Sequence, residues 1–141
     1  MFEAVTARAP ETDIIIKAAA VADYRPAQVA DNKIKKKDGD LSLPLERTRD
    51  ILGELGKNKR PGQFLCGFSM ETENMLENSR AKLTKKNLDL IAANNVLTPG
   101  AGFAGDTNAL TLISPEGVKE LPLLSKDAAA DALLDEIMKR I

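Results

Sequence analysis

Residues able to bind a phosphorylated group gather in two neighbouring segments of this sequence. An acid, a phenol and a guanidinium stand together at Asp23–Arg25, just after the apolar run Asp13–Val21. The segment Asp31–Asp40 then holds four lysines and only one apolar residue, Ile34. Lysines on a flexible loop can neutralise a polyphosphate and the oxygens of its leaving group. Two simpler interpretations stay open: Asp23 can bond the backbone N–H groups of a turn, and the lysines can belong to a solvated loop.

Two more segments place useful side chains beside predicted strands. Gly67–Thr72 brings Phe68 and small residues to the end of an apolar run, which can receive a planar base, although Phe68 can equally belong to the core. Lys82–Asn87 ends an amphipathic segment, where cations also serve as ordinary helix caps. Ligands of open α/β sheets bind beyond the carboxyl ends of the strands, and we expect all these groups to meet there. Together they favour a nucleotide or another phosphorylated ligand.

The elements that must position these residues alternate between short apolar runs and amphipathic segments, as in an α/β domain. Parallel strands are predicted at Asp13–Val21, Gln63–Phe68 and Leu88–Ala93, the first of them central and covered on both faces. Helices are predicted at Met1–Arg8, at Thr48–Leu55 with Gly56 as the stop, at Thr72–Lys86 and from a Ser125 cap to Ile141. The last helix is expected to bury Ala130, Leu133, Leu134, Ile137, Met138 and Ile141. With a hairpin of Asn108–Ile113 and Val118–Pro122, the sequence predicts a Rossmann-like three-layer α/β domain with a mainly parallel sheet and an antiparallel edge hairpin.

The composition excludes several classes of function. The 141 residues fit one domain, and 20 Lys+Arg against 21 Asp+Glu give a net charge of -1, which provides no global attraction to nucleic acid or to an anionic membrane. Cys66 is the single cysteine and the sequence has no histidine, so Cys/His zinc sites and His-dependent catalysis are excluded. No apolar run approaches the ~18 residues that span a bilayer, and the start lacks a signal peptide. We therefore expect a cytoplasmic protein with no nucleic acid and no membrane partner.

Six motifs in their order and spacing resemble bacterial phosphopantothenoylcysteine synthetases. They are AAAVADYRP, DNKIKKK, TRDIL, GFSMET, KLTKKNLDLIAANN and GFAGDTNALTLI. The resemblance covers about Asp13 to Ile141 and implies the synthetase half of a bifunctional coenzyme A biosynthesis protein, fused in the parent protein to a flavin-dependent decarboxylase domain. It implies a ligase that activates 4'-phosphopantothenate with CTP as an acyl-cytidylate, joins it to L-cysteine and releases CMP and pyrophosphate. It also implies Mg2+ with the nucleotide and a homodimer, for which strand Leu110–Ile113 is expected to supply the contact.

The same resemblance implies site residues position by position. Lys33, Lys35 and Lys36 match a mobile catalytic flap, and Asp23 matches an acid of the nucleotide site and a candidate metal ligand. The implied nucleotide-binding positions are Lys17, Ala18, Ala19, Asp23, Lys33, Arg49, Asp50, Ile51, Leu52, Phe68, Lys82 and Lys86. Relatives commonly have proline where this chain has Arg49, a change that leaves a backbone-mediated role intact. Nucleotidyl transfer to a carboxylate needs charge stabilisation and alignment rather than a protein nucleophile, so the absence of histidine is no obstacle.

The first strand of the resembled family, with its glycine-rich phosphate loop and an Asn that steadies the acyl intermediate, has no counterpart in this sequence. We therefore expect residues 1–141 to be the C-terminal portion of the synthetase domain, able to bind CTP weakly but unable to form the amide alone. Two other functions stay open. One is a non-catalytic nucleotide-binding module or an inactive fragment of the ligase, and the other is a plain interaction domain whose lysines only promote solubility. Titration with CTP, followed by an assay of pyrophosphate release, separates them.

Overall fold

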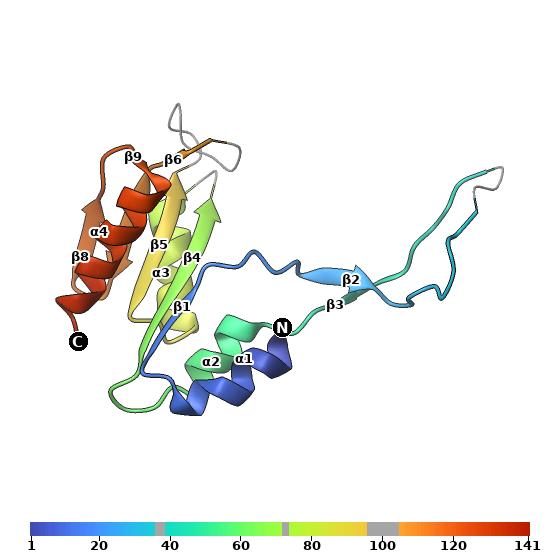
Figure 1. The fold of residues 1–141 in the computed structure, drawn as a ribbon, viewed down its shortest axis with the longest axis horizontal. Helices are drawn as coiled ribbons and strands as arrows, with labels where there is room; N and C mark the ends of the chain where they lie inside the picture. Colours follow the sequence, from blue (N-terminus) through green and yellow to red (C-terminus); the bar gives the residue numbers. More distant parts are fainter. Residues whose placement is uncertain (36–38, 72–73, 96–104) are drawn as a thin grey trace. The chain divides into compact units, whose positions relative to one another are not determined.

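The computed structural model describes most of the chain, namely residues 1–35, 39–71, 74–95 and 105–141 (Figure 1). These residues form two compact units. Residues 1–19 together with 51–141 form the first, which we call the sheet unit. Residues 20–50 form the second, which we call the ribbon unit because its regular structure is a two-stranded ribbon. The lysine-rich segment therefore belongs to a different unit from the strands that carry the other candidate residues.

A five-stranded sheet with the order β1-β4-β5-β7-β8 forms the centre of the sheet unit. Its strands are β1 (Ile14–Lys17), β4 (Phe64–Glu71), β5 (Leu90–Asn95), β7 (Leu110–Ser114) and β8 (Gly117–Glu120). The first three strands are parallel, and β7 and β8 add an antiparallel hairpin. The predicted mainly parallel sheet with an antiparallel edge hairpin is confirmed. Because β7 is paired on both sides, the expectation that Leu110–Ile113 supplies a dimer contact is wrong.

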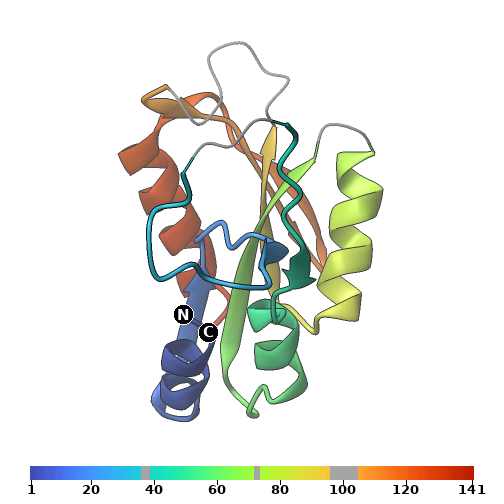
Figure 2. The same ribbon diagram turned by 90° about the vertical axis from the view of Figure 1, so that its right-hand side faces the viewer.

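Helices cover both faces of this sheet, which confirms the three-layer α/β prediction. They are α1 (Phe2–Arg8), followed by the 3-10 turn η1 (Ala9–Glu11), α2 (Ile51–Lys57), α3 (Met75–Lys85) and α4 (Lys126–Met138). In Figure 2, α4 lies on one side of the sheet, and α2 and α3 lie on the other. Cys66, Leu90 and Leu112 of the sheet pack in one core with Leu133 and Ile137 of α4. A short pair of strands, β6 (Thr107–Asn108) and β9 (Leu124–Ser125), precedes α4.

The last helix begins as predicted but buries a different stripe. Its Ser125 cap is confirmed, since the Ala128 N–H donates to Ser125 Oγ at 3.2 Å. Leu134 and Met138 are exposed, and so is Ile141, contrary to the prediction. Glu136 lies on the buried face instead because its carboxylate is paired with cations, including Lys119 at 2.7 Å. An ion pair inside the packed face therefore replaces part of the predicted apolar stripe.

The short helix α2 differs from its prediction at both ends. It begins at Ile51, and Thr48 is not its cap because the Thr48 hydroxyl donates to the carbonyl oxygen of Ala22. Gly56 lies inside the helix rather than after it. A Cβ at Gly56 would stand 1.8 Å from the carbonyl oxygen of Lys86, so only glycine allows this close approach. Asn87, with φ of 52°, completes the contact by donating Nδ2 to the Gly56 carbonyl at 2.9 Å.

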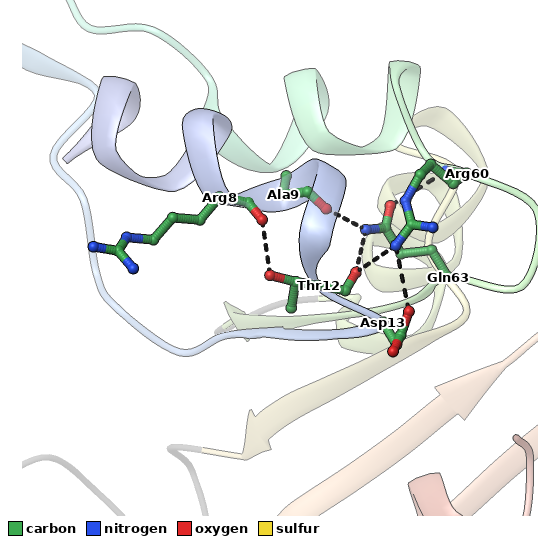
Figure 3. A network of polar contacts seen from close by, with 6 residues as sticks. All are labelled: Arg8, Ala9, Thr12, Asp13, Arg60 and Gln63. Carbon is green, nitrogen blue, oxygen red and sulfur yellow. Dashed lines mark hydrogen bonds and ion pairs between the residues drawn. The ribbon is translucent and has the colours of Figure 1, made fainter.

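Strand β1 is predicted to be central, but among the described strands it lies at one edge of the sheet. A polar network holds it and α1 against the start of β4 (Figure 3). Gln63 Nε2 donates to the carbonyl oxygens of Ala9 at 2.8 Å and of Thr12 at 2.6 Å. Arg60 also donates to Thr12 and pairs with Asp13 at 3.3 Å. These contacts therefore fix the connection between α1 and β1 within the sheet unit.

Candidate functional site

The carboxyl ends of the parallel strands form the candidate site of the sheet unit, and we call it the strand-end site. It comprises Lys17–Ala19 at and after the end of β1, Phe68–Met70 in the carboxyl-terminal half of β4, and Asn94–Asn95 at the end of β5. The parallel register sets Lys17 beside Gly67 and Phe68 beside Ala92. Open α/β sheets bind their ligands beyond this end of the strands. The register therefore brings Lys17 close to Phe68, whereas the predicted meeting with Asp23–Arg25 of the ribbon unit stays a prediction.

Lys17 shapes the chain where β1 ends. Its Nζ donates to the carbonyl oxygen of Ala19 at 2.8 Å, so the side chain closes over the two residues that follow it. Ala18 and Ala19 are exposed and carry only methyl side chains. Small exposed residues let a ligand approach the backbone closely. Their arrangement suits recognition of a ligand edge by main-chain groups, which remains a prediction.

Phe68 stands between the core and the end of β4. Its ring is half-buried and packs against the cluster under α4. The position of Phe68 is therefore compatible both with a role in the core and with contact to a ligand. On the other face of β4, Ser69 and Ser79 are buried and their hydroxyls lie 2.9 Å apart, which ties α3 to the strand. This hydrogen bond holds the carboxyl-terminal half of β4 against α3.

Ile51 and Leu52 are buried core residues of α2. A Cβ on Gly67 would lie 2.7 Å from Leu52 Cδ2, which shows how closely the helix packs on β4. Their side chains are therefore committed to packing, and only the backbone at the start of α2 is left for a ligand. This agrees with the backbone-mediated role that the sequence implies for these positions.

Asn94 is a candidate that the sequence reasoning missed. It follows the buried residues of β5 and lies beside Met70 in the register. Its Oδ1 atom is buried and accepts no hydrogen bond from any part of the chain that the structure describes. Buried polar atoms are nearly always paired, so this oxygen is available to a donor. The Asn-Asn pair directly after a continuous apolar run was the sequence signal that could have found it.

Lys82 and Lys86 come from a helix and not from the end of a strand. They lie at the carboxyl end of α3, and Lys86 caps that helix through its N–H bonds to Lys82 and Thr84. The chain then enters the amino end of β5 at Leu90. The expectation that Lys82 and Lys86 contact the nucleotide stays a prediction.

The ribbon unit pairs β2 (Tyr24–Pro26) with β3 (Leu45–Arg47) in antiparallel register. Arg25 forms an ion pair with Glu46, in which 2.6 Å separates Nη2 of Arg25 from Oε1 of Glu46. Tyr24 is covered by Arg47, with 5.5 Å between the guanidinium carbon and the ring centre. Tyr24 and Arg25, two of the three polar residues that follow the apolar run Asp13–Val21, therefore have partners within the ribbon unit. Asp23 is exposed, and its carbonyl accepts the Thr48 N–H at 2.9 Å.

Of the three candidate catalytic lysines, the structure describes Lys33 and Lys35, which are exposed and lie outside any helix or strand. Lys36 lies outside the described residues. Arg49 and Asp50, at the end of the ribbon unit, are also exposed. Within this unit, a hollow of about 250 Å³ is lined by apolar residues of both arms, including Val29, Ile34 and Leu43. Ile34 lines this hollow and is nevertheless more than half exposed.

Metal and thiol chemistry find little support in the described part of the chain. Among the residues that the structure describes, no group of three or more Cys, Asp or Glu side chains could hold a metal ion, and the assignment of Asp23 as a metal ligand stays a prediction. Burial raises the pKa of Cys66 to about 12, and the thiol is therefore inert at neutral pH. None of the described helices has the length and apolar character needed to cross a membrane.

Comparison with known proteins places this geometry in a family. The model of the DNA/pantothenate metabolism flavoprotein C-terminal domain matches residues 1–141. The chain belongs to this family. It is 49% identical to the coenzyme A biosynthesis bifunctional protein CoaBC of Bacillus subtilis over 138 residues, which are 97% of this chain and 34% of that protein. It is 44% identical to CoaBC of Escherichia coli strain K12 over 99% of this chain and 35% of that protein.

A solved structure agrees with the sequence relatives. The crystal structure of the C-terminal domain of a CoaBC protein superposes with a TM-score of 0.75 at 39% identity, covering 96% of this chain and 58% of that chain. The fold of the sheet unit is thus that of a CoaBC C-terminal domain. The chain spans about a third of the length of the curated relatives it matches.

Proposed function

We propose that the protein is the phosphopantothenate-cysteine ligase portion of a CoaBC-like protein of coenzyme A biosynthesis. The observation that carries the proposal is the 49% identity to a CoaBC protein over 97% of this chain. The strand-end site supports it, since the site offers backbone groups, a half-buried ring and a paired lysine beyond parallel strands. Such a site suits a nucleotide, and we propose that the nucleotide is CTP.

The proposed reaction has two steps. A carboxylate oxygen of 4'-phosphopantothenate attacks the α-phosphorus of CTP, and pyrophosphate leaves with the electrons of the broken P–O bond. The amine of L-cysteine then attacks the acyl carbon of the acyl-cytidylate and loses a proton, and CMP leaves. Both steps build negative charge on phosphate oxygens, which positioned cations stabilise. No step requires a protein nucleophile, in agreement with the inert thiol of Cys66.

We assign the cationic role to Lys33, Lys35 and Lys36. The first two are exposed and lie outside helices and strands, so their ammonium groups can reorient toward phosphates. We assign recognition of the base to the backbone of Ala18 and Ala19 and to the ring of Phe68. The start of α2, reached through Arg49 and Asp50, is proposed to meet the triphosphate.

Magnesium enters this proposal as the counterion of the CTP triphosphate and hence as part of the substrate. The described residues do not fit a resident metal, because they hold no cluster of acidic side chains. No step of the reaction is therefore routed through a protein-bound ion. A fused decarboxylase domain, a cytoplasmic location and a homodimer complete the proposal. Since β7 is internal, a dimer would use other surfaces than Leu110–Ile113.

The proposal is tested by following pyrophosphate release. The 141-residue chain, alone and joined to the part of a CoaBC C-terminal domain that it lacks, is mixed with CTP, Mg2+ and 4'-phosphopantothenate. We expect release only when 4'-phosphopantothenate is present and only from the joined protein. Lys57→Ala, which removes an exposed lysine of α2, is the matched control for Lys33→Ala. CTP binding without pyrophosphate release in the joined protein would instead support a non-catalytic nucleotide-binding module.

A further inference from the structure

Lys17 is the one charged residue in the apolar run that forms and follows β1. The run reads Ile-Ile-Ile-Lys-Ala-Ala-Ala-Val from Ile14 to Val21. Lysine is rarely buried without a partner, although its stem can lie along apolar surface while the ammonium keeps a polar contact. Here the side chain is half-buried, and its Nζ donates to the carbonyl oxygen of Ala19 at 2.8 Å. We call this hydrogen bond the Lys17 clasp.

The clasp starts from the face of the sheet that α2 covers. Lys17 pairs with Gly67 in the parallel register, and paired residues direct their side chains to the same face. A Cβ on Gly67 would meet Leu52 of α2, whereas Cys66 belongs to the core under α4. The stem of Lys17 therefore lies on the α2 face, and its ammonium turns forward along the chain that leaves β1.

Strand β1 stops before its partner strand does. The register of β1 with β4 ends at Lys17 and Gly67, whereas β4 runs on to Glu71. The chain after Lys17 thus leaves the sheet at the end where open α/β sheets bind their ligands. Ala18 and Ala19 are the first residues of this departing segment, and both are exposed.

The clasp takes the acceptor that would continue the ladder between β1 and β4. Carbonyl groups along a strand face alternate sides, and the Asp13 carbonyl faces β4 because it accepts the Phe64 N–H. By the same alternation, the Ala19 carbonyl is the acceptor that would next face β4, opposite the Met70 N–H. It accepts from Lys17 instead, and the ladder ends.

The clasp is also the hydrogen bond that holds this segment. Within the described ranges, no backbone hydrogen bond involves Ala18 or Ala19. A hydrogen bond from a charged donor is stronger than one between neutral groups. The conformation of the Ala18–Ala19 main chain therefore depends on the ammonium of Lys17.

We propose that Lys17 is a positioning residue of the strand-end site, whose ammonium holds the main chain of Ala18 and Ala19 in the geometry that binds the nucleotide. The inference rests on the proposed function, in which that main chain recognises the base. Lys17 acts through Ala19 and takes no part in either chemical step. Removal of its ammonium therefore weakens CTP binding and leaves the rate at saturating CTP unchanged.

The clasp is tested first without any nucleotide. Lys17→Met keeps a long, flexible side chain and removes the donor. Amide ¹⁵N relaxation in the joined protein measures main-chain order, and we expect the order parameter of the Ala19 amide to fall from about 0.85 to below about 0.6 in Lys17→Met. Lys57→Met, which removes an exposed lysine of α2, should leave it unchanged. The same order parameter in both variants would overturn the proposal.

Calorimetry and steady-state kinetics then test the positioning role. In the joined protein, we expect Lys17→Met to weaken CTP binding and to raise the KM for CTP at least tenfold, while the rate of ligation at saturating CTP stays the same. Lys17→Arg restores a cationic donor and should recover most of the affinity. Unchanged CTP affinity in Lys17→Met would contradict the positioning role. A tenfold loss of rate at saturating CTP would also contradict it, because Lys17 would then act in the chemistry.

The same measurements separate this inference from the proposed function. If the original joined protein ligates and Lys17→Met binds CTP equally well, the inference fails and the proposed function stands. If the original joined protein binds no CTP, the proposed function fails, and the positioning role of Lys17 fails with it.

Discussion

Replacing Gly56 with alanine should destabilise the sheet unit, although alanine is the better helix former. Gly56 lies inside α2. The added methyl would stand 1.8 Å from the carbonyl oxygen of Lys86, whereas contacts below 3.0 Å are essentially never seen. The neighbour is backbone and has no rotamer to change, so α2 and the turn at Lys86–Asn87 must separate by more than about 1 Å. The same movement stretches the 2.9 Å bond from Asn87 Nδ2 to Gly56.

The size of the effect follows from three contributions. Overpacking against a fixed neighbour costs about 1–3 kcal/mol. Loss of the Asn87 hydrogen bond costs about 1 kcal/mol, and the gain in helix propensity returns about 1 kcal/mol. The free energy of unfolding should therefore fall by about 2 kcal/mol, which lowers the melting temperature by roughly 6–8 °C in a chain of this size.

Thermal and urea unfolding, followed by far-UV circular dichroism, measure this change. Gly117→Ala is the matched control, because nothing lies within 4 Å of a Cβ at that position. Its free energy of unfolding should stay within about 0.5 kcal/mol of the original. If Gly56→Ala unfolds at the same midpoint as Gly117→Ala, the close approach of α2 to the Lys86–Asn87 turn is refuted.

Three further predictions concern charge, pH and the candidate base platform. In the joined protein, Lys33→Ala should lower the rate of ligation well over tenfold, because about 3 kcal/mol of transition-state stabilisation is lost. The melting temperature should stay unchanged. An unchanged rate of ligation would contradict the catalytic role of Lys33. The hydrogen bond from Lys119, with a further contribution from Arg140, lowers the pKa of Glu136. The ionised carboxylate therefore stabilises the fold above the ordinary glutamate pKa of about 4.3. This stabilisation is lost as the pH falls through the lowered pKa. Glu136→Gln should therefore be less stable than the original at pH 7, and a urea-unfolding difference that does not shrink at pH 3 would argue against it. Phe68→Leu, which keeps an apolar side chain against α4, should weaken CTP binding in calorimetry about tenfold, and an unchanged affinity would assign Phe68 to the core alone.

Strong local signals made much of the sheet unit predictable from the sequence. The apolar runs of β4 and β5, the Ser125 cap and the turn between β7 and β8 each give the correct element. The central position of β1 was not reproduced, because neighbours in a sheet are set by pairing partners rather than by the composition of one strand. The role of Gly56 was also missed, since its contact with Lys86 joins residues 30 positions apart that share no local pattern.

The candidate site was predictable only where residues directly follow parallel strands. Lys17 and Phe68 lie close in the register because Lys17 ends β1 beside Gly67, whereas β4 continues past Phe68 to Glu71, beyond the predicted end of that strand. Lys82 and Lys86 lie at the carboxyl end of α3, just before β5, as the sequence predicts, and their contact with a nucleotide stays a prediction. Asn94 was missed because an asparagine at a strand end is common, and only its buried, unpaired oxygen distinguishes it.

Oxygen transfer into CMP tests the proposed ligase reaction most directly. The joined protein is given CTP, L-cysteine and 4'-phosphopantothenate whose carboxylate carries ¹⁸O. If the carboxylate attacks the α-phosphorus, the bridging oxygen of the acyl-cytidylate leaves with the nucleotide, and mass spectrometry should find one ¹⁸O in each CMP formed. CMP without ¹⁸O, or formation of the cysteine amide without CMP, would contradict activation of the substrate as an acyl-cytidylate.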